Sequence, residues 1–400
     1  MRRPRLPRPR PLTAVLALLA PVLLVGGIWL GGHPQHLPGF ARDVLADDET
    51  VVVAEALDLV QDDYVRKLSR RDLADAAIKG MVGSLGDQFS SYFTAEEYAR
   101  YQEVTESRFS GVGLSVVGVD EGLRITRVYD GSPAKRAGLK PGDLITAVEG
   151  KPLRGVPEDT AVARVKVPAG SRVRLTVERD GKPFERTVTR ATVSIPVVES
   201  RMERDGGRKV GYVALASFSS GAHGEVGAAV RKLKQDGAKG LVLDLRGNPG
   251  GLVREAQLVA SAFIPEGPIV STKGRAVQPQ TLKATGDPVA GDLPMVVLVD
   301  RGTASSAEIV TGALKDTDRA EVVGTRTFGK GVFQEVVPLT NGGALDITVG
   351  QYFTPNGTNL GKGLKPGQGV RPEIEAEDDP DTQVDEALRA GLKALAPELS

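Results

Sequence analysis

The sequence contains no cysteine and only three histidines among its 400 residues. Without cysteine the chain can form no disulfide, no thiolate nucleophile and no Cys-ligated metal site. The three imidazoles, His33, His36 and His223, are too few for a His-rich metal centre, so we expect no metal. A charge excess is also missing, because 51 Lys and Arg residues balance 51 Asp and Glu residues. Nucleic-acid-binding proteins usually show a basic excess, so we do not expect nucleic acid as a partner.

Residues 1–32 have the pattern of a membrane anchor. Five arginines and no acidic residue lie in the first ten positions, and residues 12–30 carry no charge over 19 positions. That length just spans the hydrocarbon core of a bilayer. The arginines favour a cytoplasmic N-terminus, which would place the rest of the chain on the extracytoplasmic side of the cell membrane. A cleaved signal peptide is the alternative, but its apolar region is usually shorter, and we find no clean small-x-small cleavage site.

Two different periodicities follow the anchor. Residues 44–105 repeat apolar positions at three- and four-residue spacing, which predicts helices, and Thr94-x-x-Glu97 is a capping box. Residues 107–192 change to the two-residue period of short strands. Within them we expect a short helix over Pro133–Ala137 and a hairpin that turns at Asp180-Gly181.

The strand-rich module at 107–192 resembles a PDZ domain. Its "SGVGLSVV" stands where that family has the loop that binds a peptide carboxylate, which would consist of Gly111, Val112, Gly113 and Leu114. Such domains add an extended peptide to the edge of their sheet and hold its terminal carboxylate with backbone amides. A different small β domain with glycine turns is the alternative.

From residue 193 to 378 strands and helices alternate, and a helical tail over 379–400 completes the chain. The alternation predicts an α/β core with a mainly parallel sheet, in a chain that is α+β overall. Sites in such sheets collect where strands end. The three loops in that position are 246–251, 301–305 and 325–331.

The loop "GTRTFGKG" at 324–331 comes close to a phosphate-binding pattern. Residue 331 is glycine, however, so the pattern lacks the hydroxyl that would hold magnesium. A phosphate loop must also run into a helix, whereas "VFQEVVPL" after Gly331 favours a strand. Lys330 therefore needs another explanation. It is either a surface lysine or, between Gly329 and Gly331, a lysine buried enough to act as a base.

Ser305 is a candidate nucleophile at the predicted start of a helix. Ser305-x-x-Glu308 is also a capping box, and the two interpretations are compatible, because unpaired amides at a helix start can stabilise an oxyanion. A serine needs a base to activate it. One possibility is a His223–Asp244–Ser305 triad; the other is Lys330 with its pKa lowered by burial.

The motifs "GTASSAEIVTGALKD" and "VVGTRTFGKGVFQ" resemble the active-site region of the C-terminal processing peptidases, the tail-specific serine proteases. The motifs "AIKGMVGSLGDQFSSYFTAEEY", "LVLDLRGNPGG", "YFTPNGTNL" and "KGLKPGQGVRPE" also fall in family order. The resemblance covers nearly all of the chain beyond residue 44. It implies a protease core of the ClpP/crotonase type and no cofactor.

The resemblance also implies roles for particular residues. Ser305 would be the nucleophile, Lys330 the general base and Gln334 the residue that orients this base. The oxyanion would be met by the amide of Ser306 and by one of Gly250 and Gly251, with Asp244 and Arg246 as braces of that loop. Two departures are visible: Ser306 replaces the family's alanine, and Lys166 stands where an arginine linked to peptide-dependent activation is common.

The expected function is that of a membrane-anchored serine endopeptidase. It would capture the free C-terminus of a protein or peptide substrate through the PDZ module and cleave near it with Ser305 and Lys330. The alternative is a catalytically inactive PDZ scaffold that binds protein C-termini at the cell surface. Intact Ser305, Lys330 and Gln334 argue against the scaffold.

Overall fold

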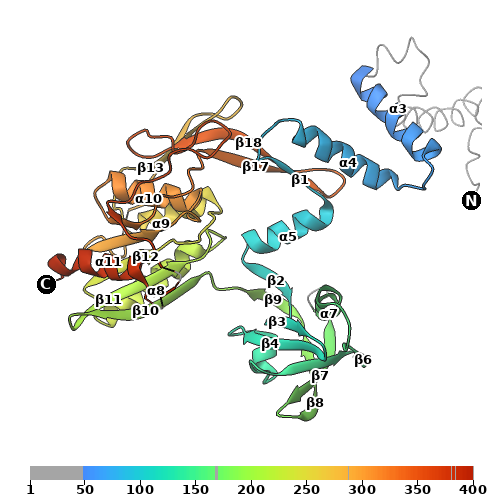
Figure 1. Cartoon of the computed structure of the whole chain (residues 1–400), viewed down its shortest axis with the longest axis horizontal. Coiled ribbons are helices and arrows are strands. Elements are labelled where there is room, and N and C mark those ends of the chain that lie inside the picture. Colours follow the sequence, from blue (N-terminus) through green and yellow to red (C-terminus); the bar gives the residue numbers. More distant parts are fainter. Residues whose placement is uncertain (1–47, 167–169, 287, 380, 383, 400) are drawn as a thin grey trace, which may run out of the picture. The chain divides into compact units, whose positions relative to one another are not determined.

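The computed structural model describes residues 48–166, 170–286, 288–379, 381–382 and 384–399 (Figure 1). The chain divides into two compact units, residues 1–85 and 86–400. None of the helices in the described part of the chain is both long and apolar enough to cross a bilayer. The anchor predicted at 12–30 lies outside the described residues.

The predicted N-terminal helices are present, with one interruption. Helices α3 (Asp48–Asp63) and α4 (Arg70–Gly83) belong to the first unit, and α5 (Ala95–Thr105) belongs to the second. The predicted capping box begins α5, because the Glu97 carboxylate accepts the Thr94 N–H at 2.8 Å and the Thr94 hydroxyl accepts the Glu97 N–H at 3.3 Å. A continuous helical reading was wrong at β1 (Ser91–Phe93), because this segment pairs with a later strand instead.

The PDZ-like module is an antiparallel sheet in the order β3-β4-β5-β7-β8, with β6 beside β5. Its inward-facing side chains, such as Ile145, Leu153, Val173 and Leu175, are fully buried in one apolar core. A separate pair, β2 with β9, flanks this sheet. The bounds are β2 (Arg108–Gly111), β3 (Leu114–Val119), β4 (Gly122–Val128), α6 (Pro133–Arg136), β5 (Leu144–Val148), β6 (Lys151–Pro152), α7 (Glu158–Val165), β7 (Arg172–Arg179), β8 (Lys182–Thr189) and β9 (Ala191–Ser194).

Two local predictions in this module are confirmed. Asp180 and Gly181 connect β7 to β8 with φ values of 52° and 73°, as a two-residue hairpin turn requires. The short helix α6 is followed by Gly138 at φ 75°. Helix α7 was not predicted. It matters because it packs against β3, at the edge of the sheet.

The core of the second unit is the expected mainly parallel sheet. Its order is β10-β11-β12-β15-β16-β19, in which every neighbouring pair is parallel except β10 with β11. The bounds are β10 (Val198–Asp205), β11 (Arg208–Leu215), β12 (Gly240–Asp244), β15 (Met295–Val299), β16 (Glu321–Gly324) and β19 (Ile374–Glu375).

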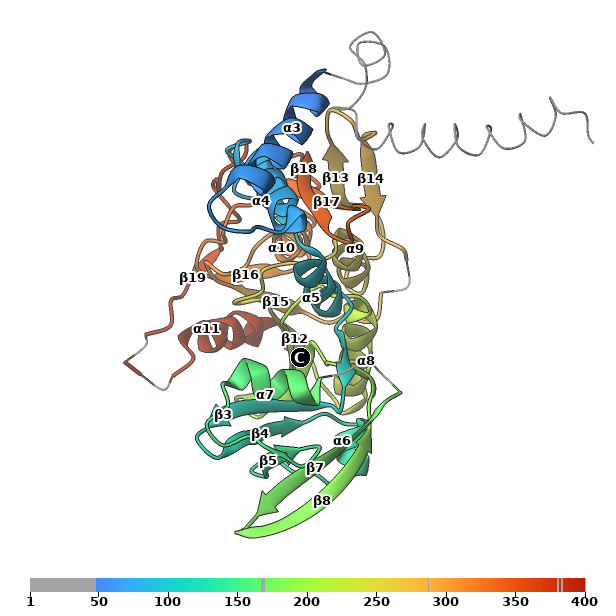
Figure 2. The same ribbon diagram turned by 90° about the vertical axis from the view of Figure 1, so that its right-hand side faces the viewer.

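Helices cover both faces of this sheet (Figure 2). Helices α8 (Ala222–Gln235), α9 (Val253–Ser261) and α10 (Ser306–Asp316) share the larger apolar core with one face. Helix α11 (Glu386–Leu395), followed by a 3₁₀ turn, packs on the other face. Because both faces are covered, all five residues of β15 are buried, as its continuous apolar run predicts.

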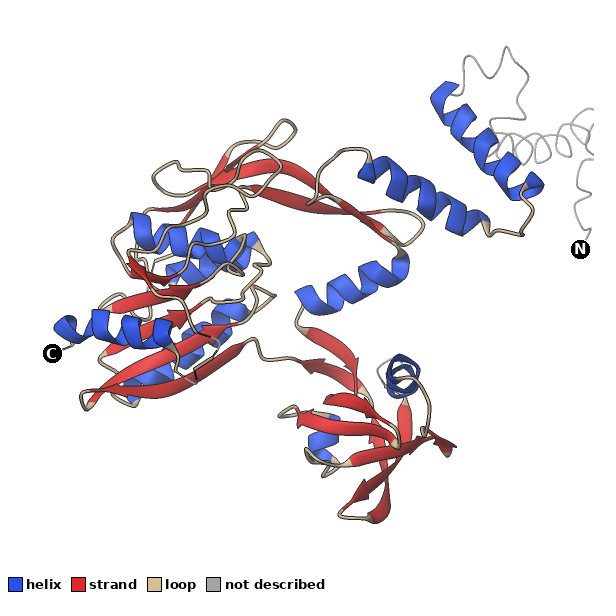
Figure 3. Ribbon diagram, viewed as in Figure 1, coloured by secondary structure: helices blue, strands red, loops and turns tan. Residues whose placement is uncertain are grey.

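A second, antiparallel sheet was not predicted. Its order is β1-β18-β13-β14, and β17 also pairs with β18. The bounds of the remaining strands are β13 (Pro268–Lys273), β14 (Gln280–Lys283), β17 (Val332–Pro338) and β18 (Ala344–Phe353), and Figure 3 shows β17 and β18 as long neighbouring strands. This sheet positions the segment that follows Lys330.

Candidate active site

The three predicted loops meet at the carboxyl edge of the parallel sheet. Backbone hydrogen bonds link them, from the Ala304 N–H to the Asn248 carbonyl at 2.9 Å and from the Phe328 N–H to the Thr303 carbonyl at 3.0 Å. The loops follow β12, β15 and β16, which are neighbours in the sheet. Three loops that are distant in sequence thus come together at the sheet edge where sites commonly form.

Ser305 lies in a strained turn between β15 and α10. Its φ and ψ are 56° and −117°, and positive φ is unfavourable for a residue with a Cβ. Such strain is often found where a nucleophile is held at a strand-to-helix turn. The Glu308 carboxylate accepts the Ser305 N–H at 3.0 Å and helps to hold this conformation.

Gly250 allows the loop after β12 to approach Ser305 closely. Its φ is 102°, and a Cβ at this position would lie 2.7 Å from the Ser305 Cβ and 3.0 Å from the Ser306 nitrogen. Only glycine fits without displacing the turn. This approach places the backbone of the glycine loop against the start of α10.

Lys330 is followed by β17 rather than by a helix, so the phosphate-loop interpretation is wrong. A Cβ at Gly331 would lie 2.4 Å from the Gly361 nitrogen, and the Gly329 carbonyl accepts the Gly367 N–H at 2.9 Å. The segment around 361–367 therefore closes over this loop. Burial lowers the pKa of Lys330 below its usual range, and the carboxylates of Asp346, Asp87 and Glu308 oppose part of that change.

Gln334 contacts Lys330 directly. The Lys330 Nζ donates to the Gln334 Oε1 at 2.6 Å, and the Gln334 Nε2 donates to the Thr348 hydroxyl at 2.9 Å. On a flat strand two residues four positions apart would lie about 13 Å apart. The contact is possible because Lys330 precedes β17 and because the β17–β18 register shifts between Phe333 and Gln334.

Glu308 joins the serine loop to the lysine loop, a role that the capping-box pattern did not reveal. Its side chain is fully buried. In addition to the Ser305 N–H, its carboxylate accepts the Gly329 N–H at 2.7 Å, the Lys330 N–H at 2.9 Å and the Thr327 hydroxyl at 2.5 Å. Burial raises the pKa of Glu308, and these four hydrogen bonds lower it in part.

The N-terminal motif "GDQFS" supplies a further wall beside Lys330. The Lys330 Nζ lies 5.2 Å from the centre of the Phe89 ring, and the Asp87 carboxylate accepts the Ser90 hydroxyl at 2.6 Å. Burial acts to raise the pKa of Asp87, but hydrogen bonds from Ser90, Thr348 and the Phe89 N–H outweigh it and lower this pKa. The motif alone gives no sign of this role, because nothing in the sequence shows that Asp87 and Phe89 lie beside Lys330.

Ser305, Lys330 and Gln334 line one cavity of about 470 Å³. Gly250 and Gly251 line it as well, as does Asp346 from β18. The described residues contain no group of three or more His, Asp or Glu side chains that could hold a metal ion. The cavity offers a hydroxyl, an amine, a carboxylate and backbone amides as its reactive and polarising groups.

Gly250 and Gly251 differ in whether their backbone N–H groups are free to bind an oxyanion. The Gly250 N–H already donates to the Asn248 side chain at 2.9 Å. The N–H groups of Gly251 and Ser306 have no partner among the described residues. The Ser306 hydroxyl donates to the Gly251 carbonyl at 2.8 Å, which fixes the two segments relative to each other.

The histidine triad receives no support from the geometry. The His223 Nδ1 lies 2.8 Å from the Glu255 carboxylate, and His223 does not line the cavity. Asp244 accepts the Tyr212 hydroxyl at 2.6 Å and pairs with Arg246 at 2.6 Å. Arg246 also pairs with Asp378 and Asp385, so Asp244 and Arg246 brace the loop as expected.

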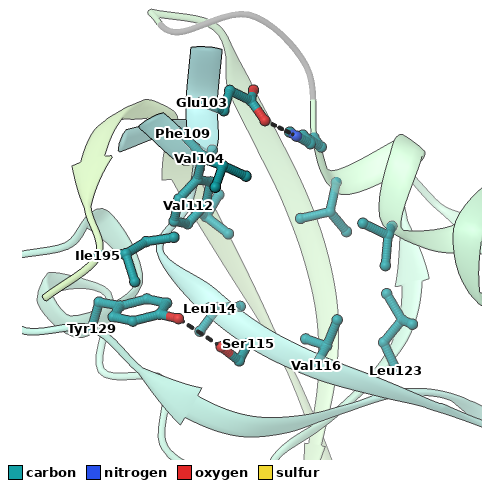
Figure 4. A pocket seen from close by; sticks show the side chains of 14 residues that line it. Glu103, Val104, Phe109, Val112, Leu114, Ser115, Val116, Leu123, Tyr129 and Ile195 are labelled. Carbon is teal, nitrogen blue, oxygen red and sulfur yellow. Dashed lines mark hydrogen bonds and ion pairs between the residues drawn. The ribbon is translucent and has the colours of Figure 1, made fainter. Parts of the chain in front are cut away.

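The PDZ-like module has an apolar groove of about 330 Å³ between β3 and α7 (Figure 4). Leu114 and Val116 of β3 form one side, and Val162 and Val165 of α7 form the other. Because β3 is an edge strand, its outer hydrogen-bonding groups can receive an added strand.

The predicted carboxylate loop lies at this groove. Gly111, Val112 and Leu114 line it, whereas Gly113, at φ 86°, lies in the bend but not in the lining. The amides of Val112 and Gly113 have no partner within the described part of the chain. Lys166 also lines the groove and forms an ion pair of 2.5 Å with Glu103 of α5, drawn as a dashed line in Figure 4.

Known families match three consecutive parts of the chain. The N-terminal domain of the activating protease CtpB matches residues 41–97, a PDZ domain matches 124–179, and peptidase family S41 matches 209–376. These matches indicate a peptidase of family S41 that contains a PDZ domain.

Two relatives that align with most of this chain are C-terminal processing proteases by name. A carboxyl-terminal-processing protease of a Synechocystis species is 36% identical over 396 residues, covering 94% of this chain and 92% of its own. A carboxy-terminal-processing protease of Bartonella bacilliformis is 37% identical over 328 residues, covering 80% and 73%. Among solved structures, the photosystem II D1 C-terminal processing protease is 28% identical, covers 89% of this chain and 100% of its own, and has a TM-score of 0.48.

The chain belongs to the C-terminal processing peptidase family. It is a C-terminal processing serine protease with a PDZ domain, as the sequence motifs predict. The family is one of enzymes, which speaks against the alternative of a non-catalytic scaffold.

Proposed function

We propose that the protein is a membrane-anchored endopeptidase that cleaves near the C-terminus of its substrates with a Ser305–Lys330 dyad. The contact that carries this proposal is the hydrogen bond of the Lys330 Nζ to Gln334, inside the cavity that Ser305 lines. Burial favours the uncharged amine that a general base requires.

The reaction begins when neutral Lys330 removes the proton of the Ser305 hydroxyl and the Oγ attacks the peptide carbonyl. The amides of Ser306 and Gly251 stabilise the oxyanion, because both are free to donate, whereas the Gly250 amide already has a partner. Lys330 then gives the proton to the leaving amine, and the acyl-enzyme forms. Water hydrolyses it with Lys330 again as the base.

The substrate's free C-terminus binds in the groove of the PDZ-like module. Its backbone adds to β3, its apolar side chains enter the groove, and the amides of Val112 and Gly113 meet its carboxylate. The anchor at 12–30 holds these parts on the extracytoplasmic side of the membrane, as the arginine-rich start favours.

Cleavage of a peptide with an apolar C-terminus by the full-length protein in detergent tests the dyad. Ser305→Ala and Lys330→Ala should each reduce kcat/KM by at least about a thousandfold, with the urea unfolding midpoint unchanged. His223→Ala is the matched control and should keep its activity. Loss of activity in His223→Ala alone would overturn the dyad. Protease protection of the full-length protein in sealed membrane vesicles tests the orientation.

A further inference from the structure

The active-site cavity contains a carboxylate that the proposed reaction does not use. Asp346 lies on β18 opposite Val336 of β17, and both residues line the cavity. The other ionisable side chains of the lining are Lys330 and Tyr101. Asp346 is therefore the single acidic residue among the described residues that line this cavity.

Within the described part of the chain, the Asp346 carboxylate accepts no hydrogen bond and forms no ion pair. The neighbouring groups behave differently, because the Lys330 amine donates to Gln334 and the Asp87 carboxylate accepts from Ser90. Burial raises the pKa of Asp346 to about 6, with Lys330 lowering it and Asp87 raising it, so this carboxylate is ionised at neutral pH. A partly buried charge without a partner is costly, and a ligand that supplies a donor recovers that cost.

The cavity that Asp346 lines also contains a group of apolar side chains beside its polar ones. These apolar side chains include Val104, Phe218, Leu252, Val253 and Phe333 together with Val336. Apolar side chains and one anionic group match a side chain that has an aliphatic stem and a cationic head. Lysine and arginine are the natural side chains with that construction. A glutamate in the same place would bring two carboxylates together.

We propose that Asp346 is a specificity residue, which binds the side chain of a lysine or arginine of the substrate close to the cleaved bond. This assignment rests on the proposed function, because it places the substrate in the cavity of Ser305 and Lys330. The PDZ groove and its apolar preference are separate from it. Selection would thus occur twice, once at the tail and once beside the reacting bond.

The test uses peptides that share one apolar C-terminal tail and differ at a single position near the cleaved bond. That position carries lysine, methionine or glutamate and is moved through the three residues on either side of the bond. At one position, the full-length protein in detergent should cleave the lysine peptide with a kcat/KM about tenfold above that of the methionine peptide. The glutamate peptide should be the poorest substrate.

Three variants assign any preference to the carboxylate. Asp346→Asn should remove the preference for lysine, and Asp346→Lys should reverse it in favour of glutamate. Glu335→Gln is the matched control, because Glu335 lies on β17, is exposed and does not line the cavity. This control should keep the wild-type ratio. A role of Asp346 in folding alone would change all three peptides equally and leave the ratio intact.

Equal kcat/KM for the three peptides, or a preference that persists in Asp346→Asn, would overturn the assignment. Cleavage of the methionine peptide reports the proposed function by itself, so such a result would leave the protease mechanism in place. If no peptide is cleaved, binding of the same fluorescent peptides to Ser305→Ala decides. Tighter binding of the lysine peptide that Asp346→Asn abolishes would support the assignment, and equal binding would overturn it.

Discussion

The groove of the PDZ-like module and the cavity of the protease core differ in how many of their backbone groups already have a hydrogen-bond partner. The groove keeps backbone groups free, because β3 is an edge strand and the amides of Val112 and Gly113 have no partner among the described residues. In the loops of the cavity most amides are already engaged, four donors converge on Glu308, and Ser305 is held in a strained conformation.

This contrast indicates which parts of the molecule should tolerate substitution. A groove that binds through a sheet edge and apolar walls loses affinity gradually when one wall residue changes. A cavity that depends on a strained serine and a shared carboxylate should fail steeply when one donor or acceptor is lost. Substitutions in the cavity should therefore reduce activity more than substitutions in the groove.

Removal of the Glu308 carboxylate should have the largest effect. Glu308→Ala leaves the buried amide of Gly329 and the partly buried amides of Ser305 and Lys330 without their acceptor. We expect a loss of about 3 kcal/mol in the free energy of unfolding, measured with urea, and loss of detectable cleavage. Glu308→Gln keeps one acceptor oxygen, so its stability and activity should lie between those of the wild type and of Glu308→Ala. Wild-type stability in Glu308→Ala would show that the loops are held by other contacts.

Gly250→Ala should reduce kcat by about a hundredfold, because its Cβ would collide with Ser305 and displace the nucleophile. Gly247→Ala is the matched control in the same loop. Gly247 also has a positive φ, of 66°, but a Cβ there meets nothing within 4 Å. This variant should pay only the conformational cost of about 1 kcal/mol in stability. Similar kinetics in the two variants would mean that close approach to Ser305 is unimportant.

A charge in the PDZ groove should impair tail capture alone. Val162→Asp places a carboxylate between β3 and α7, so KM for a peptide with an apolar free C-terminus should rise about tenfold. The kcat should stay within twofold of the wild-type value at saturation. The same peptide with an amidated C-terminus serves as control, because its KM should depend little on the groove. An equal loss for both peptides would argue that the groove does not read the tail.

The smallest expected effect is a shift in the pH dependence of kcat/KM when Asp346 is replaced by asparagine. Cleavage requires uncharged Lys330, so kcat/KM should rise with pH and level off above the pKa of Lys330, which burial places below its usual range. Above pH 6 ionised Asp346 favours the ammonium form and so raises that pKa. Asp346→Asn should therefore shift the acid limb of the profile to lower pH, with a few-fold gain for the methionine peptide near neutrality. A shift to higher pH would contradict this sign.

The parallel sheet and its three loops could be predicted because their signals are local. Buried strands such as Met295–Val299 read as continuous apolar runs, and the helix after Ser305 begins at the predicted residue. The resemblance to a family then assigned the serine and the lysine. In the structure Lys330 donates a hydrogen bond to Gln334, and Ser305 lines the same cavity.

The parts that escaped prediction depend on long-range pairing. Strand β18 alternates apolar Leu345, Ile347 and Val349 with polar residues, but this pattern does not identify its partners, and β1 and β13 lie far from it in sequence. Asp346 and Thr348 could therefore not be placed in the site. Glu308 was found only as a capping residue, because the sequence does not show that its carboxylate also reaches the amides beyond Thr327.

Glu308 couples the loop of Ser305 to the loop of Lys330. One carboxylate anchors the turn of the nucleophile and the turn of the base, so neither turn can relax without releasing the other. Burial raises the pKa of Glu308 in this connected arrangement, so by linkage protonation favours the connected arrangement over an opened one, and acidification alone should not separate the turns. Removal of the carboxylate by substitution should instead release both turns together, because the amides of Ser305, Gly329 and Lys330 share this one acceptor.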